Sequence, residues 1–407
     1  MGIEEGRSVV VDDSSNVYLT GLFTGSADFD PSNNMFLLTA AGGSAFEGYV
    51  VKLDINGDLV WAKQLGGTNS DVGRGISINS NGDLFVTGTY RGTADLDPSL
   101  SAANFTSNGS DDVFIVKLDR NGNFGWAKSI GGSGADLANG IAVDSFSNVI
   151  VIGQFLGNVD FDPSVGNSFI QAGGFYDTFI LKLDSSGNFN WAQRLNSTSN
   201  VNSRFVKTDN SNNIYLTGGF TGTLDINPDT NITQNIFNAG SDDVFVLKLN
   251  ENGRYLWGFT AGGLNFDQAT SLEISHSSHI FISGFFNSTI DFDPSPGILS
   301  LTPTASRDAF IAKYSNPTIT SLQSVNNNSI VRLSPNPTNG SVFLDLKTVQ
   351  ENIKYSIYDL RGKLISTEHL LSSTSSFSIS FDGFPRGVYI VSISTHQFST
   401  HQRIVIQ

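Results

Sequence analysis

The chain has 407 residues, which is enough for two or more domains with their own cores. Its 38 acidic and 23 basic side chains give a formal charge of −15, and an acidic protein repels phosphate backbones, so we expect no nucleic-acid partner. Cysteine is absent, which excludes disulfides, thiolate metal sites and cysteine nucleophiles. No apolar run approaches the roughly 18 residues that a membrane span needs.

The chain opens directly on a repeated unit. Residues 1–7 lack the basic segment and apolar stretch of a signal peptide. Each unit contains four predicted strands, and in the second unit they are residues 74–78, 83–88, 114–118 and a segment centred on Trp126. A short turn joins the first two strands, and a second turn, which opens on Asp or Asn and has Gly at its fourth position, joins the last two. Such turns form hairpins, so we expect antiparallel four-stranded sheets.

A loop between the second and third strands fixes the period of the repeat. Its copies lie 67, 65, 65 and 66 residues apart. They are Asp28-Phe29-Asp30-Pro31, Asp95-Leu96-Asp97-Pro98, Asp160-Phe161-Asp162-Pro163, Asp225-Ile226-Asn227-Pro228 and Asp291-Phe292-Asp293-Pro294. A near-constant step of this size indicates one supersecondary unit copied around an axis or along a stack.

The third strand of each unit is almost continuously apolar, as in residues 179–183. A strand of this kind has both faces covered, which is the situation of a blade packed between two neighbours. We therefore predict an all-β fold, a β-propeller of about five four-stranded blades. The tryptophans, which follow the recurring lysines Lys52, Lys117, Lys182 and Lys248 by nine residues, are interpreted as blade-packing residues, with sugar platforms as the alternative.

The repeat also resembles a known family. The frame formed by residues 131–136, 140–144, 148–153 and 177–184 is similar to the bacterial SBBP-type β-propeller repeat, over about residues 1–314. The fifth unit has its third strand (310–314) but no tryptophan strand. If upstream residues supplied that strand the ring would close, so we expect residues 1–314 to be an N-terminally truncated propeller domain.

A different pattern follows the repeats. We interpret the polar residues 315–330 as a linker and residues 331–407, with alternating strands, as a small Ig-like antiparallel β-sandwich. This block resembles the type A sorting domain of the type IX secretion system of Bacteroidota. The residues that carry the resemblance are Pro335, Asn336, Pro337, Tyr358, Asp359, Gly362, Lys363, Gly387, Tyr389 and Arg403. The resemblance implies export, the secretion machinery as a partner, and a location outside the cell or on its outer surface.

The repeated acids are the candidate metal ligands. Paired carboxylates in a loop suit Ca²⁺, which prefers oxygen ligands, and each unit adds an acid before its third strand (Glu47, Asp112, Asp177, Asp243 and Asp308). The predicted ligands are Asp28, Asp30, Asp95, Asp97, Asp160, Asp162, Asp225, Asp291 and Asp293, with a weaker site where Asn227 replaces the second Asp. The alternative is that these side chains hold the loop by accepting backbone hydrogen bonds.

No catalytic residues can be assigned from the sequence. Some glycosidases are propellers, but their two acids come from different blades, whereas here every unit carries the same set. The first His is at position 276, and His276 and His279 are interpreted as turn residues, with a local metal pair as the alternative. We therefore predict a secreted or surface-displayed propeller that binds an extracellular protein or glycan without catalysis. A carbohydrate-active hydrolase that uses propeller Asp residues is the alternative.

Overall fold

A computed structural model describes most of the chain. The described residues are 2–173, 175–275, 277–294, 299–315, 331–334, 340–350, 353–359, 363–370, 374–394 and 399–406. They form strands and turns, divided between two compact units, residues 1–317 and 318–407. No helix that is long and apolar enough to cross a membrane occurs among them.

The first unit consists of five antiparallel sheets, which follow the five sequence copies in order. The first contains β1 (Glu4–Val11), β2 (Val17–Phe23), β5 (Glu47–Leu53) and β6 (Leu59–Gly67). The second contains β7 (Val72–Ile78), β8 (Leu84–Asp95), β9 (Asn104–Leu118) and β10 (Phe124–Ile130), and the third β11 (Leu137–Val143), β12 (Val149–Phe155), β15 (Asp177–Leu183) and β16 (Phe189–Ser197). The fourth contains β17 (Val201–Thr208), β18 (Ile214–Phe220), β21 (Asp243–Leu249) and β22 (Tyr255–Ala261). The fifth contains β23 (Gln268–Ile274), β24 (Ile280–Phe286) and β27 (Asp308–Tyr314).

A small hairpin extends between the second and third strands of each sheet, and we call it the arm. The arms are formed by β3 (Ser26–Asp28) with β4 (Leu37–Thr39), β13 (Asn158–Asp160) with β14 (Phe169–Gln171), β19 (Thr223–Asp225) with β20 (Asn235–Phe237), and β25 (Ile290–Asp291) with β26 (Ser300–Leu301). In the second sheet the long strands β8 and β9 run on into the arm. The arms also join neighbouring sheets, because β6 pairs with β8 and β16 pairs with β19.

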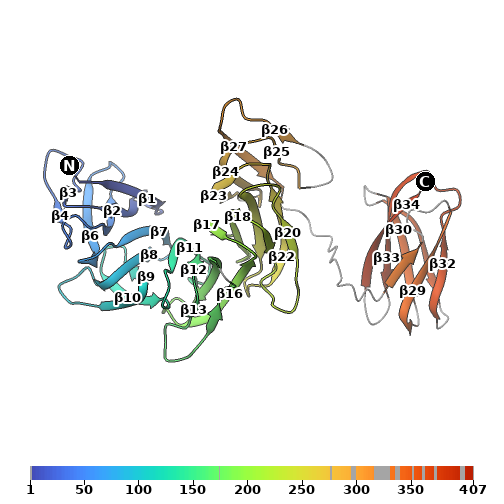
Figure 1. Ribbon diagram of the computed structural model, residues 1–407, viewed down its shortest axis with the longest axis horizontal. Coiled ribbons are helices and arrows are strands. Elements are labelled where there is room, and N and C mark those ends of the chain that lie inside the picture. The colour runs from blue at the N-terminus through green and yellow to red at the C-terminus, as the bar shows by residue number, and fades with distance from the viewer. Residues whose placement is uncertain are drawn as a thin grey trace. The chain divides into compact units, whose positions relative to one another are not determined.

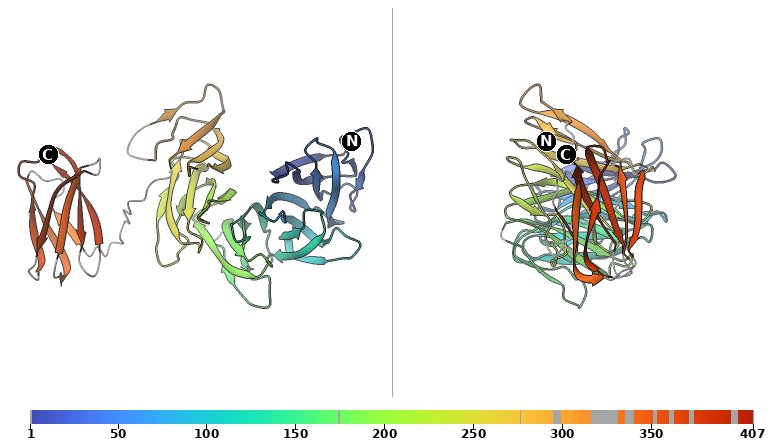
Figure 2. Two further views of the ribbon diagram at one scale, coloured as in Figure 1. Left: turned by 180° about the vertical axis from the view of Figure 1, so that it is seen from behind. Right: turned by 90° about the vertical axis from the view of Figure 1, so that its right-hand side faces the viewer.

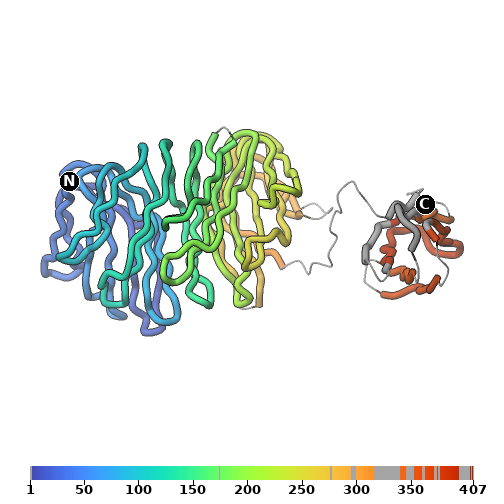
Figure 3. The backbone as a smooth tube through the Cα atoms, turned by 90° about the horizontal axis from the view of Figure 1, so that it is seen from below, coloured from blue at the N-terminus to red at the C-terminus, as the bar shows by residue number. Residues whose placement is uncertain are grey.

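The five sheets follow one another around an open arc, with the first strand of each on the inside (Figure 1). The inner strands pack in order, β1 against β7, β7 against β11, β11 against β17, and β17 against β23. Figure 2 shows the same arc from behind, and Figure 3 shows the sheets side by side in chain order. The all-β propeller fold predicted from the sequence is confirmed, and the number of blades stays a prediction.

The core lies between adjacent sheets, as the continuous apolar strands predicted. Along β12, Val149 and Val151 pack with the second sheet, whereas Ile150 and Ile152 pack with the fourth. Every residue of β15 and of β21 is buried. A strand with two dry faces needs a neighbour on each side, and this requirement holds successive blades together.

The turns form as their residues dictate. In the turn between β5 and β6, Asp54 Oδ1 accepts hydrogen bonds from the backbone N–H of Asn56 at 2.8 Å and of Asp58 at 2.9 Å. Gly57 takes a φ of 86°, which glycine adopts without steric cost. The same pattern recurs at Asp119 and Asp184, so the hairpins predicted from these turns are present.

The second unit consists of two antiparallel sheets. One contains β28 (Val331–Ser334), β29 (Ser341–Gln350) and β32 (Thr374–Ser380). The other contains β31 (Leu364–Leu370), β30 (Ile353–Asp359), β33 (Gly387–Ser394) and β34 (Ser399–Ile406). Their inner faces share one core that includes Leu344, Ile357 and Val391. This is the small seven-stranded sandwich that the alternation predicted.

Candidate functional site: the cavity of the inner strands

Each inner strand has a β-bulge at the same position of the repeat. In β1, Gly6 pairs with Gly21 and Ser8 with Thr20, so Arg7 has no partner residue in β2. The extra residue in the five strands is Arg7, Arg74, Asn139, Arg204 and Thr270, and we call this set the bulge row. Bulges are common next to binding sites, where they redirect a side chain.

A glycine in the second strand makes each bulge possible. A Cβ atom added to Gly153 would lie 2.0 Å from the carbonyl oxygen of Leu137, on the neighbouring inner strand. The equivalent glycines Gly21, Gly88, Gly218 and Gly284 meet an inner-strand carbonyl oxygen at 1.9–2.0 Å in the same way. Only glycine permits this approach, so the bulge depends on the sequence of two strands.

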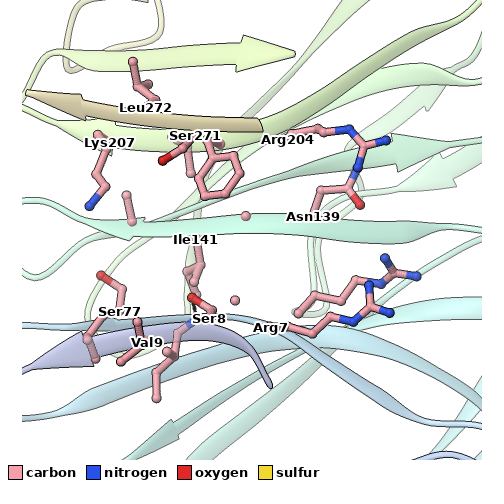
Figure 4. Close-up of a pocket in the computed structure, with 18 of the residues that line it drawn as sticks. Arg7, Ser8, Val9, Ser77, Asn139, Ile141, Arg204, Lys207, Ser271 and Leu272 are labelled. Atoms are coloured by element: carbon pink, nitrogen blue, oxygen red, sulfur yellow. Dashed lines mark hydrogen bonds between the residues drawn. The ribbon is translucent and has the colours of Figure 1, made fainter. Parts of the chain in front are cut away.

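The bulge row lines a single cavity of about 800 Å³ to which all five inner strands contribute. Arg7, Asn139 and Arg204 lie at one end, and Lys207 and Ser77 lie toward the other (Figure 4). Between the two ends an apolar residue from each strand contributes to the wall: Val9, Ile76, Ile141, Val206 and Leu272. Ile76, Ile141, Val206 and Leu272 are buried in the cores between blades, so the exposed apolar side chains of the lining are Val9 and Phe205.

Arg74 is the most unusual residue of the cavity. Its Nε is buried without a hydrogen-bond partner. Burial lowers the pKa of the guanidinium, and the positive charges of Arg7 and Arg204 lower it further. No acid forms an ion pair with Arg74 within the described parts of the chain. A buried cationic donor without a partner is energetically unfavourable.

The other two arginines are partly compensated. Arg7 forms an exposed ion pair with Glu5 at 3.1 Å. Burial lowers the pKa of Arg204, and the nearby Asp242 opposes this effect. With its amide in the orientation that satisfies both groups, Gln268 accepts hydrogen bonds from Nε and Nη2 of Arg204 at 3.1 and 3.2 Å. Three guanidinium groups are thus gathered at one end of the cavity in an otherwise acidic unit.

The remaining bulge residues connect neighbouring strands. Asn139 Nδ2 donates to Asn202 Oδ1 and to the carbonyl oxygen of Ser203, both at 3.0 Å, which links the third blade to the fourth. Thr270 Oγ1 donates to the carbonyl oxygen of Ser283 at 3.4 Å. At the opposite end of the cavity Lys207 and Glu273 form an ion pair at 2.8 Å.

One cavity position breaks the symmetry of the blades. Phe205 follows the bulge in β17, whereas the equivalent residues of the other strands are small. They are Ser8, Gly75, Gly140 and Ser271. An aromatic ring at this one position makes the fourth blade different from the rest.

The repeated Asp residues lie elsewhere, in the arms. Asp160 Oδ1 accepts from the backbone N–H of Asp162 at 3.1 Å and of Ser168 at 2.7 Å. Asp162 Oδ1 accepts from the N–H of Ser164 at 2.9 Å. The first Asp makes the same two bonds in all five arms, at Asp28, Asp95, Asp160, Asp225 and Asp291. These bonds hold the loop in shape.

The predicted calcium ligands stay a prediction. Asp30 and Asp97 accept from Ser32 and Ser99 as Asp162 does from Ser164, and Asp293 donates its backbone N–H to Asp291. Among the described residues no three His, Asp or Glu side chains are grouped so that they could hold a metal ion. Of the alternative histidine pair, His276 lies outside the described residues, and His279 Nδ1 lies 2.7 Å from Ser277 Oγ within the turn.

The acids expected before the third strands lie within those strands in the structure, and most of them are buried. Glu47 Oε2 accepts from the N–H of Ala41, whereas Oε1 is buried without a partner. Burial raises the pKa of Glu47 to about 7, and the nearby Asp71 acts in the same direction. Burial likewise raises the pKa of Asp112 and of Asp243 to about 6, and each has a second acid nearby, Asp136 and Asp267. Asp177 is buried as well, and Asp308 is partly exposed.

The recurring lysines form ion pairs within their blades, and the tryptophans pack between neighbouring blades. Lys117, Lys182 and Lys248 form ion pairs at 2.9, 2.8 and 3.7 Å with Asp83, Asp144 and Asp209 in the first turn of their own blades. The tryptophans Trp61, Trp126, Trp191 and Trp257 pack into the cores between blades. Trp61 and Trp126 also donate to carbonyl oxygens in the next blade.

The sorting-motif residues that are described have structural roles. Asp359 closes the turn after β30 by accepting the N–H of Lys363 at 2.9 Å. The Tyr389 hydroxyl donates to the carbonyl oxygen of Pro385 at 2.8 Å. Tyr358 lies in β30 and Gly387 begins β33. Pro335, Asn336, Pro337 and Gly362 lie outside the described residues, and of Arg403 only the backbone within β34 is described.

Two family models match segments of the chain. Residues 332–407 match the family model of the secretion system C-terminal sorting domain, and residues 60–89 match that of the beta-propeller repeat. The chain combines an SBBP β-propeller repeat with a type IX secretion sorting domain. This sorting domain indicates export to the cell surface or the extracellular space and implies contact with the secretion machinery.

Individual proteins are more distant. A WD repeat-containing protein of Acanthamoeba polyphaga mimivirus is 28% identical over 283 residues, 60% of this chain and 20% of that protein. The regulatory protein FlaEY of Caulobacter vibrioides is 26% identical over 144 residues, 34% of this chain and 14% of that protein. The chain thus spans about a fifth or less of the length of these relatives.

Solved structures are similar only at a low level. The BSP domain of a biofilm-associated protein matches with a TM-score of 0.16 and 8% identity, over 99% of this chain and 96% of that one. A structure described as the basis for Dscam isoform specificity matches with a TM-score of 0.12 and 6% identity, over 83% and 98%.

The sequence reasoning missed the bulge row. The signal was present, because its members recur with the same steps of 67, 65, 65 and 66 residues as the Asp loops. The position was overlooked because its residue type changes from copy to copy. The glycine opposite each bulge, as in Thr87-Gly88, is the constant mark that could have revealed it.

Proposed function

We propose that the exported propeller is a non-catalytic binding or scaffold module that takes its ligand in the cavity of the inner strands. The observation that carries this proposal is the bulge row. Five bulges at one repeat position bring five side chains to a common cavity. Each bulge interrupts the regular pairing between the first and second strands of its blade. Because the bulge recurs in every blade while its side chain differs, a role in ligand binding explains it better than a purely structural role.

The composition of the cavity wall supports binding without catalysis. Among the described lining residues the only carboxylate is Glu273, which is engaged by Lys207, and the wall contains neither Asp nor His. The lining serines therefore have no general base beside them, and an acid pair for glycoside hydrolysis is missing from this wall. The buried acids Glu47 and Asp112, with no exposed surface, offer no access to a substrate.

Export narrows the choice of ligand. A protein delivered to the surface or beyond it meets extracellular proteins and glycans, and we propose one of these classes as the partner. The cavity is large enough for a side chain cluster or a short saccharide, because ligand sites commonly enclose about 300–1,000 Å³.

The test is a binding screen with a blocked cavity. The full chain and its Ser271→Trp variant, in which the indole ring would occupy part of the cavity, would be compared on arrays of extracellular glycans and proteins. The matched control is Val165→Trp, which places the same side chain on a fully exposed loop. We expect binding by the wild type and Val165→Trp and its loss in Ser271→Trp. Ligand turnover by the wild type would instead support the hydrolase, and equal binding by all three proteins would place the site outside the cavity.

A further inference from the structure

We infer that the cavity binds a small organic anion, whose carboxylate or sulfate group is held by Arg74 with Arg7 and Arg204 beside it. This inference rests on the proposed binding function and names the chemistry of the ligand. Its first support is the distribution of charged residues. Residues 1–330 contain 16 Lys and Arg against 33 Asp and Glu, yet three of these arginines occupy equivalent bulges of one cavity.

The bulges direct these three arginines into the cavity. In a regular ladder successive side chains alternate between the two faces of a sheet, and an inner strand without a bulge would keep that alternation throughout. The extra residue interrupts it at the one position where Arg7, Arg74 and Arg204 stand. All three belong to the cavity lining, and Arg7 and Arg204 lie at the same end (Figure 4).

The arginine end of the cavity lacks an acceptor for Arg74. The positive charges of Arg7 and Arg204 both act on Arg74, and its Nε has no acceptor. Glu5 and Asp111 partly offset the repulsion at Arg74, and Asp242 acts on Arg204, but Glu5 pairs with Arg7 and Asp111 with Arg91. An oxyanion would supply the missing acceptor and offset the repulsion, since planar guanidinium groups bind carboxylates and similar anions through paired hydrogen bonds.

The rest of the cavity indicates an organic ligand of low charge. Beyond the arginine end, the exposed side chains of Val9 and Phe205 provide apolar surface that suits the carbon skeleton of a ligand. A long polyanion would be repelled by the net negative charge of residues 1–330, whereas the charge of one or two oxyanion groups would be balanced by the three arginines. A sugar acid has the size and the charge that this arrangement fits.

Calorimetric titration of the full chain tests the inference with three probes: glucuronate, glucose and inorganic sulfate. Glucuronate and glucose have the same ring and differ at one carbon, a carboxylate against a hydroxymethyl group. We expect glucuronate to bind at least tenfold more tightly than glucose, and sulfate to compete with glucuronate. Arg74→Gln should weaken glucuronate binding at least tenfold, and Arg254→Gln, which removes the same charge from an exposed turn, should leave it unchanged.

The exposed Arg7→Gln variant keeps the test decisive if Arg74→Gln fails to fold, because it should weaken glucuronate binding severalfold. Absence of glucuronate and sulfate binding by the wild type would overturn the inference. So would equal affinity for glucose and glucuronate, or equal behaviour of the cavity variants and Arg254→Gln. The proposed function would survive these results if Ser271→Trp still abolished binding of a neutral ligand from the arrays.

Discussion

The arms and the inner strands of the propeller are repeated with equal regularity, but they differ in what is kept constant. In the arms the side chains themselves recur, and each first Asp makes the same two backbone hydrogen bonds. In the inner strands the backbone bulge recurs, and the side chain it presents changes from Arg to Asn to Thr. Constant side chains thus mark the framework, and a constant backbone with changing side chains marks the site.

The largest expected effect is on the free energy of unfolding, and it should differ between a lysine within a blade and a lysine of the cavity. Lys182 and Asp144 form a buried ion pair at 2.8 Å, whereas Lys207 and Glu273 form an exposed pair at the same distance. Lys182→Met leaves a buried carboxylate without its partner and should reduce the free energy of unfolding by about 3–5 kcal/mol. Lys207→Met should reduce it by less than about 1 kcal/mol. Urea unfolding of both variants measures the difference, and equal losses would contradict the distinction.

A smaller effect is expected in the pH dependence of stability. The pKa of Glu47 is about 7 in the folded protein and lies near 4.5 when the chain is unfolded. Between these values the folded state holds a proton that the unfolded state has lost, so stability falls as pH rises from about 4.5 to 7. Glu47→Gln should remove this part of the slope and raise the melting temperature above that of the wild type at pH 8. Parallel curves for the two proteins from pH 4.5 to 8 would refute the assignment.

The smallest effect, close to zero, is expected in the arms. Asn227 Oδ1 accepts the N–H of Asp229 at 3.0 Å, just as Asp162 Oδ1 accepts that of Ser164. Asp162→Asn should therefore leave the melting temperature within about 1 °C of the wild type, because the amide oxygen keeps the hydrogen bond. Added EDTA should shift neither protein. A lower melting temperature of the wild type in EDTA, with a smaller response in Asp162→Asn, would support the calcium site instead.

The strands and turns of the blades could be predicted from the sequence because they depend on local interactions that recur in every copy. Asx turns, alternating and continuous apolar strands, and the Gly at position 57 each carry their own structural signal, and five copies make the signal unmistakable. The sequence also predicted that the last repeat lacks its tryptophan strand, and the fifth sheet has three strands within the described chain. The sorting-domain match depended on several motifs in the right order and is confirmed by the family comparison.

The cavity could not be predicted in the same way, because it depends on contacts between blades. Arg7, Arg74 and Arg204 are far apart in the sequence, and their common site exists only after the sheets pack. The single aromatic Phe205 looked like an ordinary apolar strand residue. The most constant residues of the repeat, Asp and Trp, lie in the framework, whereas the candidate site is formed at a position whose residue type changes between copies.

The dependence of each bulge on a facing glycine separates the fold of this protein from its recognition. Gly153 and its equivalents allow the same bulge in every blade, while the residue at the bulge itself differs between blades. Under the proposed function, duplication of a blade would add one more bulge residue, and substitutions at the five bulge positions would change the chemistry of the cavity. Evolution, or a protein engineer, could thus obtain cavities of different chemistry from one unchanged scaffold.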